Sequence, residues 1–266
     1  MATESSAVAS RWQDAFRALR HRNFRLYTIG IVVSQSGTWI QSVAQSWLVY
    51  RLTGSEFLLG LTWFFTHIPV LVLAPAGGLA ADRWPRRTIV LTAQSCAMVQ
   101  ALALAALTLS GRIELWHVMT LALLLGVINA FDIPGRQSLF VELVGREELL
   151  NAISLNSAAF NLARIGGPAI AGLLIAALGE GWCFLVNGVS FTVVIVCLAA
   201  MRLPPPERPA DGAAAARLGA RVTVFDEQAA IRALLAMSGA VNLSGAPGVA
   251  LAPFFADGIF QRGSVG

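Results

Sequence analysis

The chain has 266 residues, of which 56% are hydrophobic and only 13% are charged, with a formal net charge of +4. Soluble domains carry roughly 25% charged residues, so this composition excludes a cytosolic enzyme, a secreted disulfide scaffold and a disordered tail. Mean hydropathy is +0.66 and the isoelectric point is about 9.6. The basic residues lie in loops between apolar segments, where they indicate membrane topology rather than nucleic-acid binding.

The first 25 residues are polar and arginine-rich and lack the apolar core of a cleavable signal peptide. We therefore expect residues 1–25 to form a basic cytoplasmic segment. Cys96, Cys183 and Cys197 lie inside apolar runs without a CxxC pair, and the three histidines do not cluster. Packing explains these cysteines best, and we expect no metal and no cofactor.

Seven apolar segments then follow in chain order. Each of the first six is long enough to cross a hydrocarbon layer of ~30 Å as a helix, which satisfies its own backbone there. Their expected ranges are 26–50, 57–80, 88–110, 115 to about 133, about 152 to 179, and 182–201, with a weaker seventh from about 233 to 256. We expect an all-α membrane protein with a six-helix bundle over 26–201. A cytoplasmic linker over 202–232 and a seventh transmembrane helix within 233–266 follow it.

The distribution of arginines predicts the orientation of these spans. With a cytoplasmic amino terminus, fourteen of the nineteen arginines fall in cytoplasmic segments, and only Arg51 and Arg112 lie outside before the seventh span. This asymmetry follows the positive-inside rule. Trp116 and Trp182 begin two spans at the predicted outer boundary, where indole rings anchor. We expect a multi-pass protein of the bacterial inner membrane that contacts lipid and no nucleic acid.

Polar side chains inside three spans repeat at helical spacing, and such a stripe faces protein or a water-filled cavity. The candidate cavity-lining residues are Ser34, Thr38, Gln41 and Gln45 in the first span, Asn129, Asp132 and Arg136 in the fourth, and Asn161 and Arg164 in the fifth. Hydrogen bonding between helices is the alternative explanation for the serines and glutamines. Spans 88–110 and 182–201 carry no comparable stripe, so we expect them to be lipid-facing supports.

Three ionisable residues lie inside the predicted spans, and their positions suggest possible roles. Arg164 lies ~18 Å from the inner end of its span and needs water, carbonyls or a carboxylate, in a functional cavity or a structural ion pair. Asp132 is expected near the cytoplasmic end of its span, where a gate or capping role and a substrate role are the alternatives, and it is the first proton-coupling candidate. His67 is a second proton-coupling candidate, with plain packing as the alternative.

The turn from Gly77 to Arg87 reads GGLAADRWPRR. It resembles the signature between helices two and three of the major facilitator superfamily, although Pro85 stands where that family usually has glycine. The resemblance implies a cytoplasmic gate latch, in which a glycine permits close helix approach and the charges pair across the gate. The matching positions are Gly78, Asp82, Arg83, Arg86 and Arg87.

A second motif covers Gly167, Pro168 and Gly172 in GPAIAG, which is similar to the Gly-Pro motif of the family's exporters and antiporters. Close helix packing alone also explains these residues. The segments RNFRL, GTW, WLVY and FDIPGRQ resemble the exporter branch that includes enterobactin exporters and macrolide efflux proteins. The resemblance implies a secondary transporter that exports a small amphipathic molecule, such as a siderophore or a drug, in exchange for protons.

The resemblance covers only the first half of a twelve-helix fold and its seventh helix, so we expect a truncated product. The alternative function is a non-transporting membrane fragment that is inert or needs a second-half partner chain. An intramembrane enzyme is not expected, because neither an HExxH motif nor a GxS motif with a histidine partner occurs. ATP-driven transport is not expected either, because no GxxxxGK[ST] loop occurs.

Overall fold

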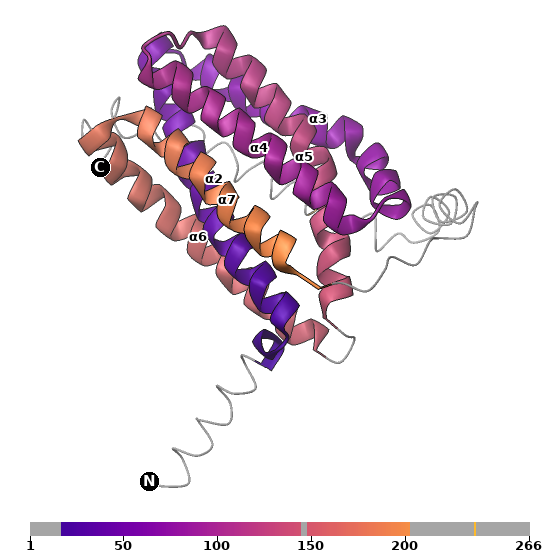
Figure 1. The fold of residues 1–266 in the computed structure, drawn as a ribbon. Coiled ribbons are helices and arrows are strands. Elements are labelled where there is room, and N and C mark those ends of the chain that lie inside the picture. Colours follow the sequence, from indigo (N-terminus) through magenta and orange to yellow (C-terminus); the bar gives the residue numbers. More distant parts are fainter. Residues whose placement is uncertain (1–16, 145–147, 203–236, 238–266) are drawn as a thin grey trace, which may run out of the picture.

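The structure, a computed structural model, describes residues 17–144 and 148–202 together with Met237, and Figure 1 shows it as a bundle of long helices. The elements in chain order are the 3-10 turn η1 (Arg17–Arg20) and the helices α2 (Arg22–Thr53), α3 (Glu56–Arg83), α4 (Arg86–Leu109), α5 (Leu115–Leu143), α6 (Leu149–Leu178) and α7 (Glu180–Ala200). The described part of the chain contains no strand, which confirms the all-α fold. Nearly all of the linker and, apart from Met237, all of the seventh span lie outside the described residues.

Five of the six predicted spans are confirmed as helices that are long and apolar enough to cross a membrane, namely α3 to α7. The helix α2 has 32 residues, which is long enough to span, but it is not among these five. Its serines and glutamines lower its hydropathy, and three of them, Ser34, Gln41 and Gln45, are buried against the other helices. The helix α2 thus buries its polar face inside the bundle, where hydrogen bonds to protein replace those to water.

The prediction that the fourth span ends at about residue 133 was wrong, because α5 continues through Pro134 to Leu143. Proline removes one backbone N–H and usually ends or bends a helix. In a membrane helix this loss is tolerated where neighbouring helices cover the freed carbonyl. Here the residue four positions before the proline is Ala130, and its carbonyl oxygen packs against Gly77 of α3.

The helices pack in two groups of three. The helix α2 packs chiefly against α6 and α7, whereas α5 packs chiefly against α3 and α4, and α4 also joins α7 (Figure 1). The expectation that the third and sixth spans are mere lipid-facing supports was wrong. In an apolar stretch of 18 residues from each helix, half of the residues of α4 and 44% of those of α7 are buried inside the bundle, compared with 17% for α3 and 22% for α6.

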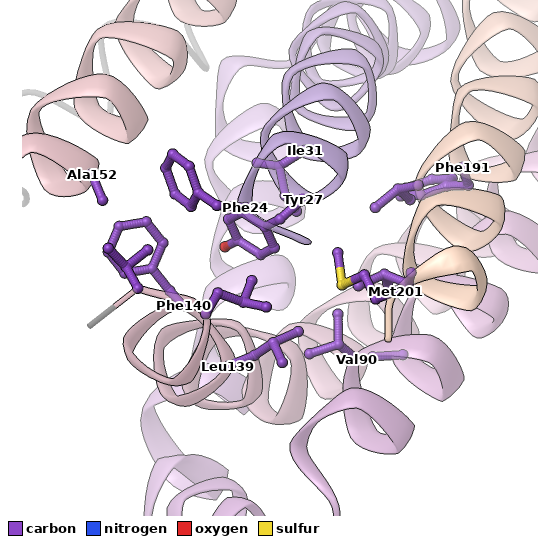
Figure 2. Close-up of a cluster of buried hydrophobic side chains, with 14 of the residues drawn as sticks. Phe24, Tyr27, Ile31, Val90, Leu139, Phe140, Ala152, Phe191 and Met201 are labelled. Carbon is purple, nitrogen blue, oxygen red and sulfur yellow. The ribbon is translucent and has the colours of Figure 1, made fainter. Parts of the chain in front are cut away.

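One end of the bundle, called the basic end below, carries Arg22, Arg83, Arg86, Arg87 and Arg202. Near it, Figure 2 shows buried side chains from five helices converging in one hydrophobic cluster. The Phe140 ring of α5 lies 5.8 Å from Phe24 and 5.9 Å from Tyr27 of α2, centroid to centroid. Aromatic pairs at this separation stabilise contacts beyond their area burial. This cluster holds α2 and α5 together near the basic end.

The contact between α3 and α5 depends on two pairs of glycine and proline. A Cβ atom on Gly77 would overlap the carbonyl oxygen of Ala130 and lie 3.2 Å from Pro134, and a Cβ on Gly126 would lie 2.8 Å from Pro69. Each helix therefore contributes one glycine and one proline, eight residues apart. Small residues let membrane helices approach closely, and the missing side chains are what bring α3 onto α5.

Candidate functional site

Asp132 is a buried carboxylate on α5, only 2% exposed. Its Oδ2 lies 2.7 Å from Nε of Arg136, one turn further along α5. Its Oδ1 accepts a hydrogen bond of 3.0 Å from Nε2 of Gln94 on α4. An ionised carboxylate away from water needs such partners, because its desolvation is costly unless charge and lone pairs are satisfied. The ion pair makes the site neutral overall, and the amide satisfies the second oxygen.

Both partners of Asp132, Gln94 and Arg136, also contact side chains of α2. The hydroxyl of Ser34 donates to Oε1 of Gln94 at 3.2 Å, and Nη1 of Arg136 donates to Oε1 of Gln35 at 3.4 Å. Ser34, Gln35, Gln94, Asp132 and Arg136 form what we call the Asp132 network. It joins α2, α4 and α5 through polar contacts around one titratable acid. Buried ionisable groups of this kind inside a membrane bundle mark ion pathways and proton relays.

The corrected length of α5 also changes the depth of Asp132. Eleven residues follow it before the helix ends at Leu143, which corresponds to about 16 Å along the helix axis. The position near the cytoplasmic end that the sequence predicted rested on a helix that stops at about residue 133. Asp132 instead lies well inside α5. A role as a simple helix cap is thereby excluded.

A second polar group lies further from the basic end and contains no titratable residue. Gln41 of α2 donates to Gln100 of α4 at 3.2 Å and accepts from Asn187 of α7 at 2.8 Å. Gln100 also donates to the carbonyl of Leu121 on α5, and Ser190 bonds to Asn187. These contacts join four helices, and hydrogen bonds between membrane helices typically contribute about 0.6 kcal/mol each.

Gln94, Gln100 and Asn187 were missed by the sequence analysis. They lie in spans without a repeating polar stripe, so periodic polarity does not indicate them. A different signal was present, because an isolated amide in an apolar membrane helix finds a hydrogen-bonding partner inside the protein. Applied to spans 88–110 and 182–201, that rule selects these three residues.

The remaining cavity-lining candidates differ in their surroundings. Thr38 donates to the Ser34 backbone carbonyl of its own helix, and Gln45 is buried. Asn129 is half-buried, whereas Asn161 is exposed and donates to the Ser157 carbonyl at 2.9 Å. Among the contacts of the described residues, none of these four side chains bonds to a side chain of the Asp132 network.

Arg164 lies at the middle of α6, fifteen residues from Leu149 and about 22 Å along the axis. It is exposed and makes no hydrogen bond or ion pair within the described part of the chain. One turn earlier, the Phe160 ring meets Trp39 of α2 edge to face, 6.1 Å between centroids. An uncompensated cation at this depth requires water, a ligand or a partner outside these residues.

His67 lies on an exposed face of α3 and is not part of the Asp132 network. Its ring stacks on Trp63 at 3.7 Å between centroids, and Nδ1 lies 2.9 Å from the Trp63 carbonyl. Both contacts are within one turn of the same helix. The second ring nitrogen makes no hydrogen bond within the described residues.

The signature turn between α3 and α4 lies at the basic end. Arg86 pairs with Glu142 of α5 at 2.9 Å, and Nη2 of Arg87 donates to the Ala199 carbonyl of α7 at 2.7 Å. Arg83 is exposed, and Asp82 is half-buried without a hydrogen bond or ion pair among residues 17–144 and 148–202. The turn therefore ties α4 to α5 and α7 and leaves one carboxylate unpaired within these ranges.

The glycines of the two motifs have different surroundings. A Cβ atom on Gly78 would have no atom within 4 Å. In the described bundle, the glycine at which α3 approaches α5 closely is therefore its neighbour Gly77. In the second motif, a Cβ on Gly167 would lie 2.5 Å from Cβ of Trp39, and Gly172 is also buried. Pro168 is half-buried between them. Gly167 thus brings α6 onto α2.

A family model described as "Transmembrane secretion effector" matches residues 13–264, nearly the whole chain. The chain belongs to this family. It is a family of major facilitator transporters, not of enzymes, so the resemblance and the multi-pass membrane character are confirmed.

Similar transporters include siderophore and drug transporters. The chain is 30% identical to the staphyloferrin A transporter of Staphylococcus aureus over 61% of this chain and 41% of that protein. It is 30% identical to the multidrug efflux pump Tap of Mycolicibacterium fortuitum over 67% and 45%. It is 27% identical to the enterobactin exporter EntS of Shigella boydii over 71% and 46%. The chain thus spans less than half the length of the relatives it matches.

Proposed function

We propose that this transporter chain exports a small amphipathic molecule, such as a siderophore or a drug, in exchange for protons. The observation that carries the proposal is Asp132. It is a buried carboxylate that pairs with Arg136 in a chain of an efflux-type family. The Asp132 network joins three helices. Protonation of Asp132 would release Arg136 from its ion pair. Proton binding would thereby change the polar contacts that join α2, α4 and α5.

The proposal is tested by expressing the chain in an efflux-deficient bacterium and following the accumulation of ethidium as a probe amphipathic molecule. We expect cells that carry the chain to accumulate less ethidium than cells with the empty vector. Collapse of the proton gradient with an uncoupler should remove the difference. Equal accumulation in both strains, with the protein verified in the membrane, would contradict export by this chain.

The position of Arg164 supports a role in substrate binding. It lies at mid-depth, exposed, one turn from the Trp39 and Phe160 rings, which is a suitable surface for an aromatic anion. A charge-assisted hydrogen bond contributes about 1.5–3 kcal/mol, so Arg164→Gln should raise the KM for an anionic aromatic probe about tenfold or more. Transport of cationic ethidium should not weaken in this way. Arg164→Lys should restore part of the loss, and an equal loss for both probes would contradict the assignment.

We further propose that the basic end faces the cytoplasm. Arginines gather at this end, among them Arg17 and Arg20 of η1, and polar contacts tie it together, including the reciprocal hydrogen bonds between Asn23 and Arg202. Reporter tags inserted after Arg87 and after Gly111 should lie in opposite compartments, the first in the cytoplasm. Both tags on one side of the membrane would contradict this topology.

The second candidate function is a half-bundle that needs a second-half partner chain, and exposed apolar faces offer that chain a docking surface. The faces of α3 and α6 present large apolar side chains, including Leu71 at 75% exposure and Ile165 at 76%. Lipid or a second bundle would both cover such faces. If a partner chain is required, ethidium efflux should appear only when the second half of a homologous transporter is co-expressed, and the two chains should co-purify.

A further inference from the structure

Ser34 differs from most other serines and threonines of its helix. Thr28, Ser36, Thr38 and Ser46 each donate to the backbone carbonyl four residues earlier, as hydroxyls in helices commonly do. Ser34 instead donates across the helix boundary to Gln94 of α4. Its own local acceptor, the carbonyl of Gly30, is therefore available as a second partner for the same hydrogen.

The side chain of Gln94 makes two hydrogen bonds, one as a donor and one as an acceptor. Its Nε2 donates to Asp132 Oδ1, and its Oε1 accepts from Ser34. The three side chains are almost completely buried, with exposures of 2% for Ser34, 4% for Gln94 and 2% for Asp132. Water therefore does not compete for these positions. Each donor must face an acceptor, because an unmatched buried polar group is costly.

We propose that Gln94 is a positioning residue that detects the protonation state of Asp132 and passes it to Ser34. This inference rests on the proposed role of Asp132 in proton coupling. When Asp132 takes a proton at Oδ1, that oxygen becomes a donor and faces the Nε2 donor of Gln94. Rotation of the carboxamide by half a turn places its oxygen toward Asp132 and its nitrogen toward Ser34. The Ser34 oxygen then accepts, and its hydrogen turns to the Gly30 carbonyl.

Two ionisable residues lie near Asp132. Arg136 lies on the same helix, and Tyr27 of α2 lies within electrostatic reach of both members of the pair. The helix α4 faces Asp132 with the neutral amide of Gln94. A carboxamide is suited to this place because it carries a donor and an acceptor and can exchange them, whereas an apolar side chain can do neither. The reversal changes the contact between α2 and α4 without adding a buried charge.

The test is infrared difference spectroscopy of the purified full chain in bilayers of phosphatidylethanolamine and phosphatidylglycerol, recorded between alkaline and acidic pH. We expect a protonated-carboxyl band that disappears in Asp132→Asn. We also expect an accompanying side-chain amide band that shifts when glutamine is labelled with ¹⁵N. The amide band should disappear in Gln94→Met. Gln100→Met is the matched control, because Gln100 is a second buried glutamine on α4 that contacts no acid among the described residues. It should keep both bands.

The variant Ser34→Ala tests the relay if Gln94→Met fails to fold. It should keep the carboxyl band and change the frequency of the amide band, since only the second partner of Gln94 is removed. A carboxyl band that depends on Asp132 without an amide band that depends on Gln94 would overturn this inference and leave proton coupling in place. The absence of any carboxyl band that depends on Asp132 would overturn the proton-coupling role and the inference with it.

Discussion

Asp132→Asn is expected to reduce proton-driven ethidium efflux to the level of cells that lack the protein. Asparagine keeps the size of the side chain, and its oxygen can still accept from Gln94, but it cannot bind and release a proton. It also leaves Arg136 without its 2.7 Å ion-pair partner. Breaking a buried ion pair costs about 3–5 kcal/mol, so protein levels must be measured together with efflux. A carboxyl-terminal fluorescent fusion provides both measurements in the same cells.

The matched control is Glu114→Gln. Glu114 is the N-cap residue of the same helix, lies at the opposite end from the basic end and is exposed. The Glu114 carboxylate accepts a hydrogen bond from Nε1 of Trp116, and a glutamine oxygen can still accept it, so efflux should not change. Loss of efflux in both variants would indicate general damage to α5. Full efflux in Asp132→Asn would contradict the role of Asp132.

Gly77→Ala is expected to have the largest effect on stability. The added methyl group would overlap the carbonyl oxygen of Ala130, a backbone atom that no side-chain rotation can move. The helices α3 and α5 would have to separate along their contact. Overpacking of a tight contact typically costs about 1–3 kcal/mol, and we expect this variant at or above the upper end. Thermal unfolding in detergent, followed by the fluorescence of the fusion protein in size-exclusion chromatography, measures the loss.

Gly78→Ala is the control on the neighbouring residue. No atom lies within 4 Å of its built Cβ, so the described bundle predicts an unchanged unfolding temperature. The comparison separates the close packing of Gly77 from any role that Gly78 has outside the described residues. If the Gly78 variant is as unstable as the Gly77 variant, close packing at Gly77 is not what holds α3 against α5.

Much of the fold could be predicted because membrane helices follow from length and hydropathy. The five apolar spans were located to within a few residues at most of their ends, and no other spanning structure was compatible with their composition. The end of α5 was misplaced because Pro134 normally stops a helix in water. Its tolerance depends on Gly77, which lies 57 residues earlier. No local pattern contains that tertiary contact.

The candidate site was predicted only in part. Asp132, Arg136 and Ser34 were selected from polar spacing, and the structure brings all three into one network. Gln94, which connects Ser34 to Asp132, was not found because it belongs to no repeating polar stripe in its apolar helix. Its importance comes from the packing of α4 against α5 and from the Ser34 hydroxyl of α2 that reaches it, and hydrophobic periodicity does not encode these tertiary contacts.

Coupling of proton movement to export by this chain can be measured directly as a change of pH inside liposomes. The purified chain is reconstituted into liposomes with a pH-sensitive dye inside, and an outward gradient of ethidium is imposed. We predict that the lumen acidifies as ethidium leaves and protons enter, and that liposomes with Asp132→Asn show no such change. A lumenal pH that follows protein-free liposomes would contradict proton-coupled export.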